Sequence, residues 1–440
     1  MMLRSSVKYL TGLSAVPLLL AGAGVLSPAT AQSCPDAALL TEGLRLPMAA
    51  IRYLADDGLG GRLAGSPGER CAGDYIASTF LRLGLRPAGD SSGFFQWLPL
   101  ASALNPHAPG GTGRNVVAVL EGSDPVLRQE YVVIGAHYDH LGGGEFNSLA
   151  PDQRGQVHNG ADDNASGVGA LLRVAERLSQ GPRPARSVLF ISFTGEESGL
   201  LGSAYFVAHP TVPRERMVGM VNMDMVGRLG SAPLIVNGVD TAEEWRGLLG
   251  PAGERAGVPF AMSGAGYGPS DHTSFYGRDI PVLHFFTNVH GDYHRPSDDW
   301  ERIDAEGIEK VAAVAGEVTA GVANRRPVLT LVRGAGTPPA PAGSQAASAG
   351  YGAWLGSVPD FAPLERGIRL SGVSPGSPAE TAGIRPGDVI VGFDGKPIAD
   401  LQAMTEVLQS HKPGDVVKVN LLREGRPLDV EVRLGTRARR

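Results

Sequence analysis

Residues 131–139 read YVVIGAHYD, and residues 187–197 read SVLFISFTGEE. Each stretch is a run of apolar residues that ends in a histidine or in acids. A continuous apolar run of this length is typical of a strand buried on both faces of a sheet. Ligands bind outside the carboxyl ends of strands in open α/β sheets, so these two stretches predict both a fold and the place of a site.

Similar apolar runs alternate with helical patterns from about residue 115 onward. We expect further strands at 116–120, 218–221, 234–236 and 282–286, and helices at 166–178, 242–256 and 305–323. Upstream, residues 36–57 and 69–83 read as helices on either side of a glycine-rich loop at 58–68. Strands that alternate with helices predict the α/β class, with a mostly parallel central sheet and helices on both faces.

Length and composition set the limits on this chain. Its 440 residues exceed what one hydrophobic core usually supports, so we expect two folded domains. Hydrophobic residues make up 42% and charged residues 19%, which is typical of globular proteins rather than of disordered ones. The formal net charge of −6 argues against nucleic acid as a partner.

The first 31 residues resemble a signal peptide. Arg4 and Lys8 precede an apolar stretch at 9–26, and Ala29-Thr30-Ala31 fits the small-x-small rule for cleavage before residue 32. A membrane anchor is the alternative, but glycines and a proline interrupt the stretch and it is short for a span. We therefore expect an exported chain, periplasmic or secreted, with no stable membrane span after cleavage.

Two cysteines remain after that cleavage, Cys34 and Cys71. In an oxidising compartment such a pair is more often bonded than free. A bond would join the mature N-terminus to the predicted helix at 69–83. Two unrelated buried thiols are the alternative, because spacing alone does not fix connectivity.

The last part of the chain changes character. Residues 331–350 are mostly Ala, Gly, Pro and Ser, which is typical of a linker. Beyond it we expect a small β-rich domain at 351–437. Its predicted strands lie at 368–373, 389–393, 416–422 and 429–434, and its predicted helix at 401–410.

Acids and histidines stand just after the predicted strands or open a helix. They are His137, Asp139, Asp162, Asp163, Glu196, Glu197, Asp224 and His294. Each motif alone is most often structural, since an acidic pair before a helix usually serves as an N-cap. Delivered together to one sheet edge, imidazoles and carboxylates are the ligand set of zinc, and a close zinc pair needs a bridging carboxylate.

The motifs HYDH, GADDNASG, TGEESGLLGS, NMDMVG, SDHTSF and DYHRPSDDW resemble the secreted di-zinc aminopeptidase family of the bacterial leucyl-aminopeptidase type, over about residues 50–325. The resemblance implies a peptidase domain at 32–330 that removes N-terminal residues from peptides with two Zn²⁺ ions. It implies His137 and Asp224 as ligands of one zinc, Glu197 and His294 as ligands of the other, and Asp163 as the bridge.

The same resemblance assigns roles around the metals. Glu196 is expected to be the general base, because it lies beside a ligand yet cannot point the same way. Asp139 is expected to orient His137, and Asp162, Asp271 and Asp298 to support the ligands. Tyr293 is expected to donate a hydrogen bond to the tetrahedral oxyanion, with a packed loop aromatic as the alternative.

The run SGVSPGSPAETAGIRPGDVIVGFDGKPI at 371–398 resembles PDZ domains of bacterial exported proteases. PDZ domains add a peptide strand to a sheet edge, so a peptide ligand is an expected partner, with Trp354-Leu355-Gly356-Ser357 as the carboxylate loop. Ser357 and Pro359 stand where apolar, strand-compatible residues are expected. A domain used for packing or regulation is the alternative.

Rival functions remain for the same motifs. A glutaminyl cyclase or a carboxypeptidase would share the fold, and an inactive PDZ-containing binding protein belongs to another class. Cyclases use a single zinc, so five ligands favour two-metal hydrolysis. A carboxypeptidase would need a basic cluster for the substrate carboxylate, and none is obvious near these motifs. The intact Glu196 argues against an inactive chain.

Overall fold

The computed structural model describes residues 33–101, 110–336 and 353–435, the last range with gaps at 360–363, 365, 375, 400–402, 405–406 and 409. The predicted signal peptide, most of the predicted linker and half of the predicted helix at 401–410 lie outside the described residues. The described residues form two sheets, one before residue 336 and one after residue 353, each with its own hydrophobic core.

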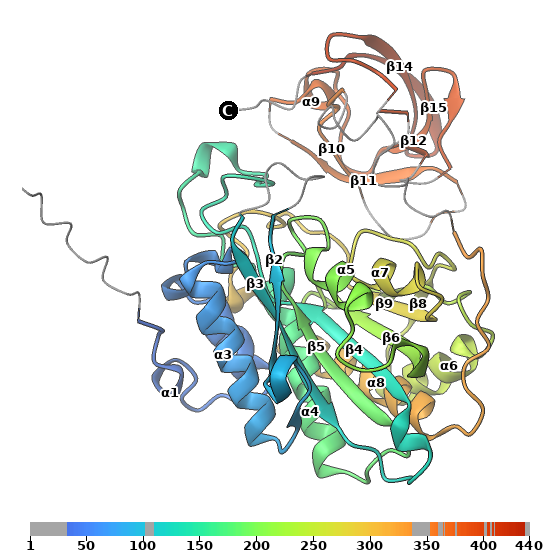
Figure 1. The fold of residues 1–440 in the computed structure, drawn as a ribbon. Coiled ribbons are helices and arrows are strands. Elements are labelled where there is room, and N and C mark those ends of the chain that lie inside the picture. Colours follow the sequence, from blue (N-terminus) through green and yellow to red (C-terminus); the bar gives the residue numbers. More distant parts are fainter. Residues whose placement is uncertain are drawn as a thin grey trace, which may run out of the picture. The chain divides into compact units, whose positions relative to one another are not determined.

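The first sheet has nine strands in the order β1-β3-β5-β4-β6-β9-β7-β8, with β2 paired to β3 (Figure 1). The strands are β1 (Arg86–Pro87), β2 (Phe95–Pro99), β3 (Thr112–Leu120), β4 (Tyr131–His137), β5 (Ser187–Phe193), β6 (Met217–Met223), β7 (Leu234–Asn237), β8 (Phe260–Met262) and β9 (Val282–Phe286). The central strands β5, β4, β6 and β9 are parallel, whereas β3 and β7 flank them antiparallel. The predicted α/β class is confirmed, with antiparallel pairing confined to the two sides.

Parallel pairing brings four carboxyl ends to the same edge of this sheet. β4 pairs with β5 in the register Tyr131↔Ser187 to His137↔Phe193, so the two strands end level. β6 pairs with β4 and with β9, which puts Met223 opposite Phe285. The motifs that follow these strands therefore start side by side.

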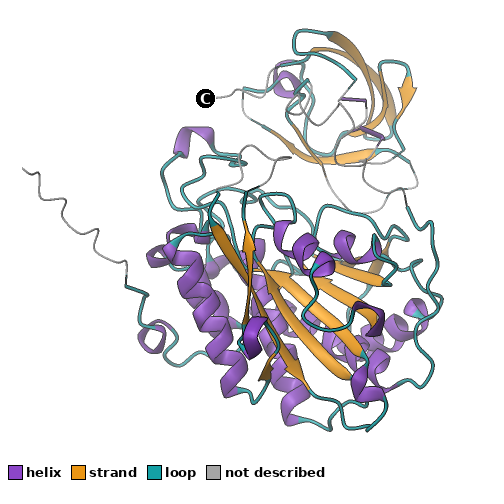
Figure 2. Cartoon of the chain, in the orientation of Figure 1, coloured by secondary structure: helices purple, strands orange, loops and turns teal. Residues whose placement is uncertain are grey.

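Helices cover both faces of the sheet, as predicted (Figures 1 and 2). One face packs against α2 (Met48–Leu54), α3 (Pro67–Arg82), α4 (Gly167–Gln180), α6 (Trp245–Ala256) and α8 (Ala305–Asn324). The other face packs against α5 (Leu201–Ala208) and α7 (His272–Tyr276), two short helices that periodicity did not reveal. Alternate residues of one strand divide between the two cores, since Ile134 belongs to the first and Val133 to the second.

The expected continuous helix at 36–57 was wrong. The chain forms α1 (Ala37–Leu40) and α2, and a turn separates them. Gly43 lies in that turn with φ +73°, a left-handed conformation that ends helical geometry, and Pro47 starts the next helix. The glycine-rich stretch that follows contains a 3₁₀ segment, η1 (Asp57–Arg62).

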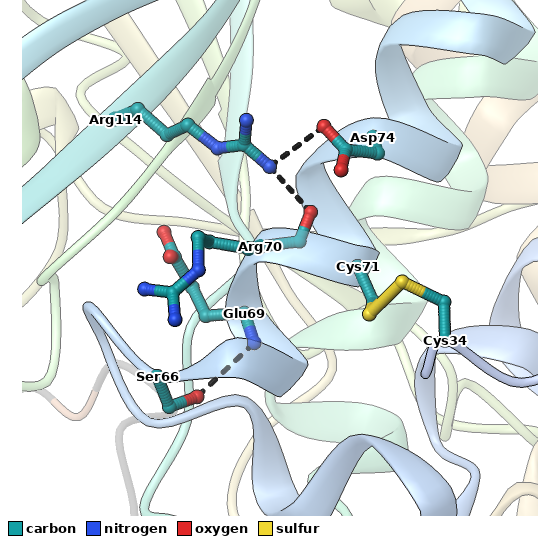
Figure 3. The surroundings of a disulfide bond; sticks show 7 residues. All are labelled: Cys34, Ser66, Glu69, Arg70, Cys71, Asp74 and Arg114. Atoms are coloured by element: carbon teal, nitrogen blue, oxygen red, sulfur yellow. Dashed lines mark hydrogen bonds and ion pairs between the residues drawn. A yellow bond between two sulfur atoms is a disulfide. The ribbon is translucent and has the colours of Figure 1, made fainter. Parts of the chain in front are cut away.

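Helix α3 anchors the N-terminal part of the described chain (Figure 3). The hydroxyl of Ser66 accepts a hydrogen bond from the backbone N–H of Glu69 at 3.1 Å, which caps the helix. Cys71, on the same helix, is bonded to Cys34, so the predicted disulfide is confirmed. Because the bond closes a loop between residues 37 positions apart, it restrains the N-terminal segment of the described chain.

The second sheet is entirely antiparallel and has the order β10-β11-β12-β14-β15, with β13 paired to β12. Its strands are β10 (Ser357–Pro359), β11 (Ile368–Val373), β12 (Val389–Phe393), β13 (Lys396–Pro397), β14 (Val416–Arg423) and β15 (Arg426–Arg433). The short helix α9 (Pro378–Thr381) is capped by the Ser377 hydroxyl, which accepts from the Glu380 N–H at 3.1 Å. The predicted β-rich character of this part is confirmed.

Candidate metal centre

Five segments deliver polar side chains to the carboxyl edge of the first sheet. His137 is the last residue of β4, Glu196 and Glu197 follow β5, and Asp224 follows β6. Asp163 and His294 come from two connecting segments. The first is the irregular turn η5 (Ala161–Ser166) that leads into α4, and the second is the loop after β9.

The carboxylate of Asp163 lies between two imidazoles. Its Oδ1 is 3.3 Å from Nε2 of His137, and its Oδ2 is 3.1 Å from Nε2 of His294. The side chain is only 5% exposed. A carboxylate whose two oxygens face two different histidines has the geometry of a bridge between two ligand groups.

The first ligand group surrounds His137. Its Nε2 is also 3.3 Å from Oδ1 of Asp224, and the three atoms of His137, Asp163 and Asp224 lie close enough to hold one ion. Oε2 of Glu196 is farther away, 4.0 Å from the same nitrogen. Glu196 therefore lies next to the first ligand group but outside it.

The second ligand group surrounds Oδ2 of Asp163. Nε2 of His294 is 3.3 Å from Oε2 of Glu197 and 3.1 Å from Asp163. Nitrogen and oxygen atoms bound tetrahedrally to one zinc ion are about 3.3 Å apart. Both groups match this spacing and contain only imidazole and carboxylate donors, so the residues fit two zinc ions.

His140 also faces the second group, although its sequence motif predicted no role for it. Its Nδ1 is 2.8 Å from Oε1 of Glu197 and 3.9 Å from Oδ2 of Asp163, and the side chain is fully buried. His140, Asp163 and Glu197 form a further set that could hold an ion. The signal was present as the last letter of HYDH, three residues beyond His137.

Two predicted supporting acids bind the ligand segments. Oδ2 of Asp298 accepts the backbone N–H groups of Asp162 and Asp163, at 2.8 and 3.1 Å. Asp162 itself points away from the ligands, because its Oδ1 accepts the Gly227 N–H at 2.6 Å and its Oδ2 is 3.1 Å from Nε2 of His290. These bonds hold the backbone on either side of the Asp163 carboxylate.

Of the other two predicted supporting acids, Asp139 contacts a proposed ligand, whereas Asp271 does not within the described part of the chain. Nδ1 of His137 is 3.2 Å from the backbone oxygen of Asp139 and 3.6 Å from its Oδ1, so Asp139 lies where it can orient the ring. Asp271 is fully buried at the start of α7, and within the described residues no hydrogen bond or ion pair joins it to the five proposed ligands. Burial raises the pKa of Asp271 to about 7.

The surroundings of Glu196 favour the protonated form of its carboxyl group. Burial, together with the charges of Asp224 and Glu197, raises the pKa of Glu196 well above its usual range. A carboxylate that readily holds a proton, next to a ligand group but outside it, is suited to proton transfer.

Tyr293 packs directly on a proposed ligand. Its ring stacks on His294 with centroids 3.9 Å apart, and it contacts the small apolar cluster of Met225, Ile235 and Phe286. Burial and the charges of the site carboxylates, Asp163 foremost, raise the pKa of its hydroxyl well above the usual value. The hydroxyl is therefore protonated at neutral pH and available as a donor.

Known families match both parts of the chain. Residues 115–319 match the model of peptidase family M28, and residues 359–434 match that of the PDZ domain. The chain carries a peptidase family M28 domain followed by a PDZ domain. The motifs of the metal centre from β4 to His294 all lie within the M28 match.

Curated relatives of the M28 domain include a protein named an aminopeptidase. The chain is 27% identical over 283 residues to leupeptin-inactivating enzyme 1 of Streptomyces exfoliatus, which covers 63% of this chain and 55% of that protein. It is 29% identical over 222 residues to aminopeptidase YwaD of Bacillus subtilis, which covers 48% of this chain and 44% of that protein. The chain thus spans about half the length of these relatives.

Solved structures share the fold of the M28 domain. A Zn-dependent exopeptidase from Parabacteroides distasonis matches with a TM-score of 0.52 at 22% identity, over 67% of this chain and 100% of that one. The glutaminyl cyclase of Bacteroides thetaiotaomicron matches with a TM-score of 0.51 at 19% identity, over 67% and 100%.

No helix in the described part of the chain is long and apolar enough to cross a membrane.

Proposed function

We propose that this chain is a zinc-dependent aminopeptidase with two metal ions. His137 and Asp224 would hold one zinc, Glu197 and His294 the other, and Asp163 would bridge them. The observation that carries the proposal is the position of Asp163, whose Oδ1 and Oδ2 face His137 and His294 at 3.3 and 3.1 Å. A structural carboxylate would not need two separate imidazoles on its two oxygens.

Zinc, when bound, lowers the pKa of a coordinated water and polarises a substrate carbonyl. Glu196 takes the proton of the attacking water and passes it to the leaving amine, since it lies beside the first group without belonging to it. The Tyr293 hydroxyl donates a hydrogen bond to the oxyanion that forms on the scissile carbonyl carbon. Its stacking on His294 keeps it at the metal centre.

Peptides with a free N-terminus are the proposed substrates, supported by relatives whose names include an aminopeptidase. The fold is shared with a glutaminyl cyclase, so the fold alone does not choose between hydrolysis and cyclisation. Two ligand groups joined by one bridging carboxylate favour the two-metal hydrolase over a cyclase with a single zinc.

We further propose a signal peptide at 1–31, export to the periplasm or medium, a peptidase domain at 32–330, a linker at 331–350 and a PDZ domain at 351–437. The Cys34–Cys71 disulfide supports an oxidising destination. In the PDZ domain the Trp354 N–H donates to the Gly435 carbonyl at 2.8 Å, so this amide of the proposed carboxylate loop is already bonded. Peptide binding there would rely on the amides that follow.

The proposal is tested by metal content and substrate choice in the same preparation. Mass spectrometry of the native protein should give two zinc ions per chain. A free-amine aminoacyl amide should be cleaved, whereas its N-acetylated counterpart should not. Release of ammonia from an N-terminal glutamine peptide, without cleavage of the chain, would instead support the cyclase.

A further inference from the structure

The glycine-rich segment at 57–63, DGLGGRL, lies well before residue 115, where the match to peptidase family M28 begins. The sequence suggests only a loop here. In the structure the segment lies against the two stretches that carry His137 and Asp163. Its central contact is the side chain of Arg62.

Arg62 is fully buried, and its guanidinium donates to four backbone carbonyls. Nε donates to Tyr138 O at 2.8 Å, and Nη2 donates to Gly160 O at 3.0 Å. Nη1 donates to Asn159 O at 2.6 Å and also to Leu54 O. Tyr138 directly follows His137, and Gly160 precedes Asp163 by three residues, so one side chain connects both ligand-bearing stretches.

Backbone bonds hold the same segment in place. The Arg62 carbonyl accepts the His140 N–H at 3.2 Å, and the Gly61 carbonyl accepts the Gly142 N–H at 2.9 Å. Gly61 has φ +72°, and a Cβ there would lie 2.5 Å from the carbonyl oxygens of Gly142 and His158. Only glycine allows this close approach.

Within the part of the chain that the structure describes, the charge of Arg62 has no direct counter-ion. Among the described residues, no carboxylate oxygen lies within ion-pair distance of its guanidinium, and burial lowers its pKa to about 10, so it stays charged at neutral pH. Burying an unpaired charge is costly. The four carbonyl dipoles and the nearby charges of Asp139 and Asp163 offset this cost. Only the planar fork of arginine reaches four acceptors at once.

We propose that Arg62 is a positioning residue for the metal centre, and that it sets the spacing between His137 and Asp163 before zinc binds. This inference rests on the proposed two-zinc site. A lysine at this position keeps the positive charge but is a point donor that cannot span the carbonyls of Tyr138 and Gly160 together. The two ligand stretches would then be free to move relative to each other.

Arg186 provides a matched control. It is 1% exposed, donates to the Val322 and Arg326 carbonyls at 3.3 and 3.0 Å, and pairs with Glu130 at 2.6 Å. It is thus another buried arginine that ties backbone carbonyls together, but none of its partners carries a proposed zinc ligand. Arg62→Lys and Arg186→Lys remove the same kind of interaction at two different places.

The experiment measures zinc affinity by competition with a chelator, and the visible absorption spectrum of the Co²⁺-substituted protein, on variants that circular dichroism shows to be folded. We expect Arg62→Lys to bind zinc 10- to 100-fold more weakly, as for loss of other outer-sphere contacts, and to change the Co²⁺ bands. Arg186→Lys should lose thermal stability while it keeps wild-type zinc affinity and spectrum. An Arg62→Lys protein with wild-type zinc affinity and Co²⁺ bands would overturn the inference.

A second variant covers the case in which Arg62→Lys does not fold. The Asn159 amide donates to Oδ1 of Asp57 at 2.7 Å and of Asp299 at 2.8 Å, and Asp57 is exposed. Asp57→Ala removes the bond between the segment at 57–63 and Asn159. We expect a several-fold loss of zinc affinity in this variant. Unchanged affinity in this variant would also overturn the inference. Wild-type protein that binds no zinc would overturn the proposed function instead.

Discussion

The backbone carbonyl of Asn147 lies 2.9 Å from Nδ1 of His294. A carbonyl only accepts, so it keeps the proton of neutral His294 on Nδ1 and leaves the lone pair of Nε2 facing Asp163 and Glu197. The Asn147 side chain also donates to the Glu197 carbonyl at 3.1 Å. One loop residue thus contacts both proposed side-chain ligands of the second zinc.

Replacing Asn147 by glycine or by alanine separates its two roles. Asn147 has φ +60°, which glycine adopts freely and alanine adopts at a cost of about 1–2 kcal/mol. Both variants lose the bond to the Glu197 carbonyl, but Asn147→Gly should keep the bond to His294 and most of the zinc affinity. Thermal melts and zinc titrations of both variants test this. Equal losses in the two would show that the backbone conformation is unimportant here.

Replacing Glu196 by glutamine should preserve zinc binding and lower kcat by about 10²–10⁴-fold, the usual contribution of a general base. The reason is its position 4.0 Å from His137, outside the first ligand group. Zinc content and turnover of one preparation decide the question. Near-normal turnover, or loss of zinc, would contradict the assignment.

Replacing Asp163 by alanine should remove metal as well as activity, because two dications about 3.5–4 Å apart repel unless a shared carboxylate offsets their charge. Asp162→Ala is the paired variant, since its carboxylate bonds Gly227 and His290 instead of a ligand atom. It should reduce stability and weaken zinc binding without abolishing it, because the Asp163 carboxylate is still present. Tight binding of two equivalents by Asp163→Ala would move the bridge elsewhere.

Glu69 gives a prediction for pH dependence. Burial raises the pKa of this carboxyl from 4.5 to about 7, while Tyr138 donates a hydrogen bond to it. Between pH 4.5 and about pH 7, the Glu69 carboxyl is protonated in the folded chain and ionised in the unfolded chain. The free energy of unfolding should therefore fall as pH rises from 4.5 to 7, by on the order of 3 kcal/mol from this group.

The measurement is urea unfolding of metal-free protein across this pH range, so that zinc release does not contribute. Glu69→Gln should flatten the curve, since glutamine has no proton to lose. Glu215→Gln, on the exposed turn at 214–216, should leave the curve unchanged. If Glu69→Gln keeps the full slope, the carboxyl is not protonated in the folded state.

Truncation should separate the two domains, and the structure determines where to cut. Leu329 is 5% exposed in the core of the first sheet, and the Ala335 carbonyl accepts the Gly266 N–H at 2.8 Å. A cut at about residue 327 would remove these contacts, so we place it after Gly336. The truncated protein should cleave small aminoacyl substrates normally and lose efficiency only on long peptides. Equal loss on both substrates would mean that the PDZ domain is part of the catalytic structure.

The sequence predicted well what depends on local pattern. The apolar runs at 187–193 and 282–286 became strands with those bounds, because buried parallel strands need uninterrupted apolar residues. Helix α3 begins at Pro67, two residues earlier than expected, because the Ser66 side chain caps it. Helix α7 has only five residues, too few to show a helical period.

The candidate site was predictable where a motif carries a proposed ligand itself, and not where a residue acts through the backbone. His137, Asp163, Glu197, Asp224 and His294 each follow a strand or open a helix, and the structure brings all five together. Arg62 and Asn147 contact main-chain carbonyls from loops, and no spacing rule connects a side chain to a carbonyl far away in sequence. His140 was overlooked beside His137.

The contacts that shape the candidate metal centre join distant parts of the chain. The site can therefore form only late in the synthesis of the chain. Arg62 bonds a carbonyl 98 positions later, and His294 bonds one 147 positions earlier. No nascent chain that ends before residue 294 possesses the second ligand group. Loading of the proposed second zinc must therefore follow synthesis of nearly the whole first domain, and for an exported chain that zinc would come from the compartment in which the chain folds rather than from the one in which it is translated.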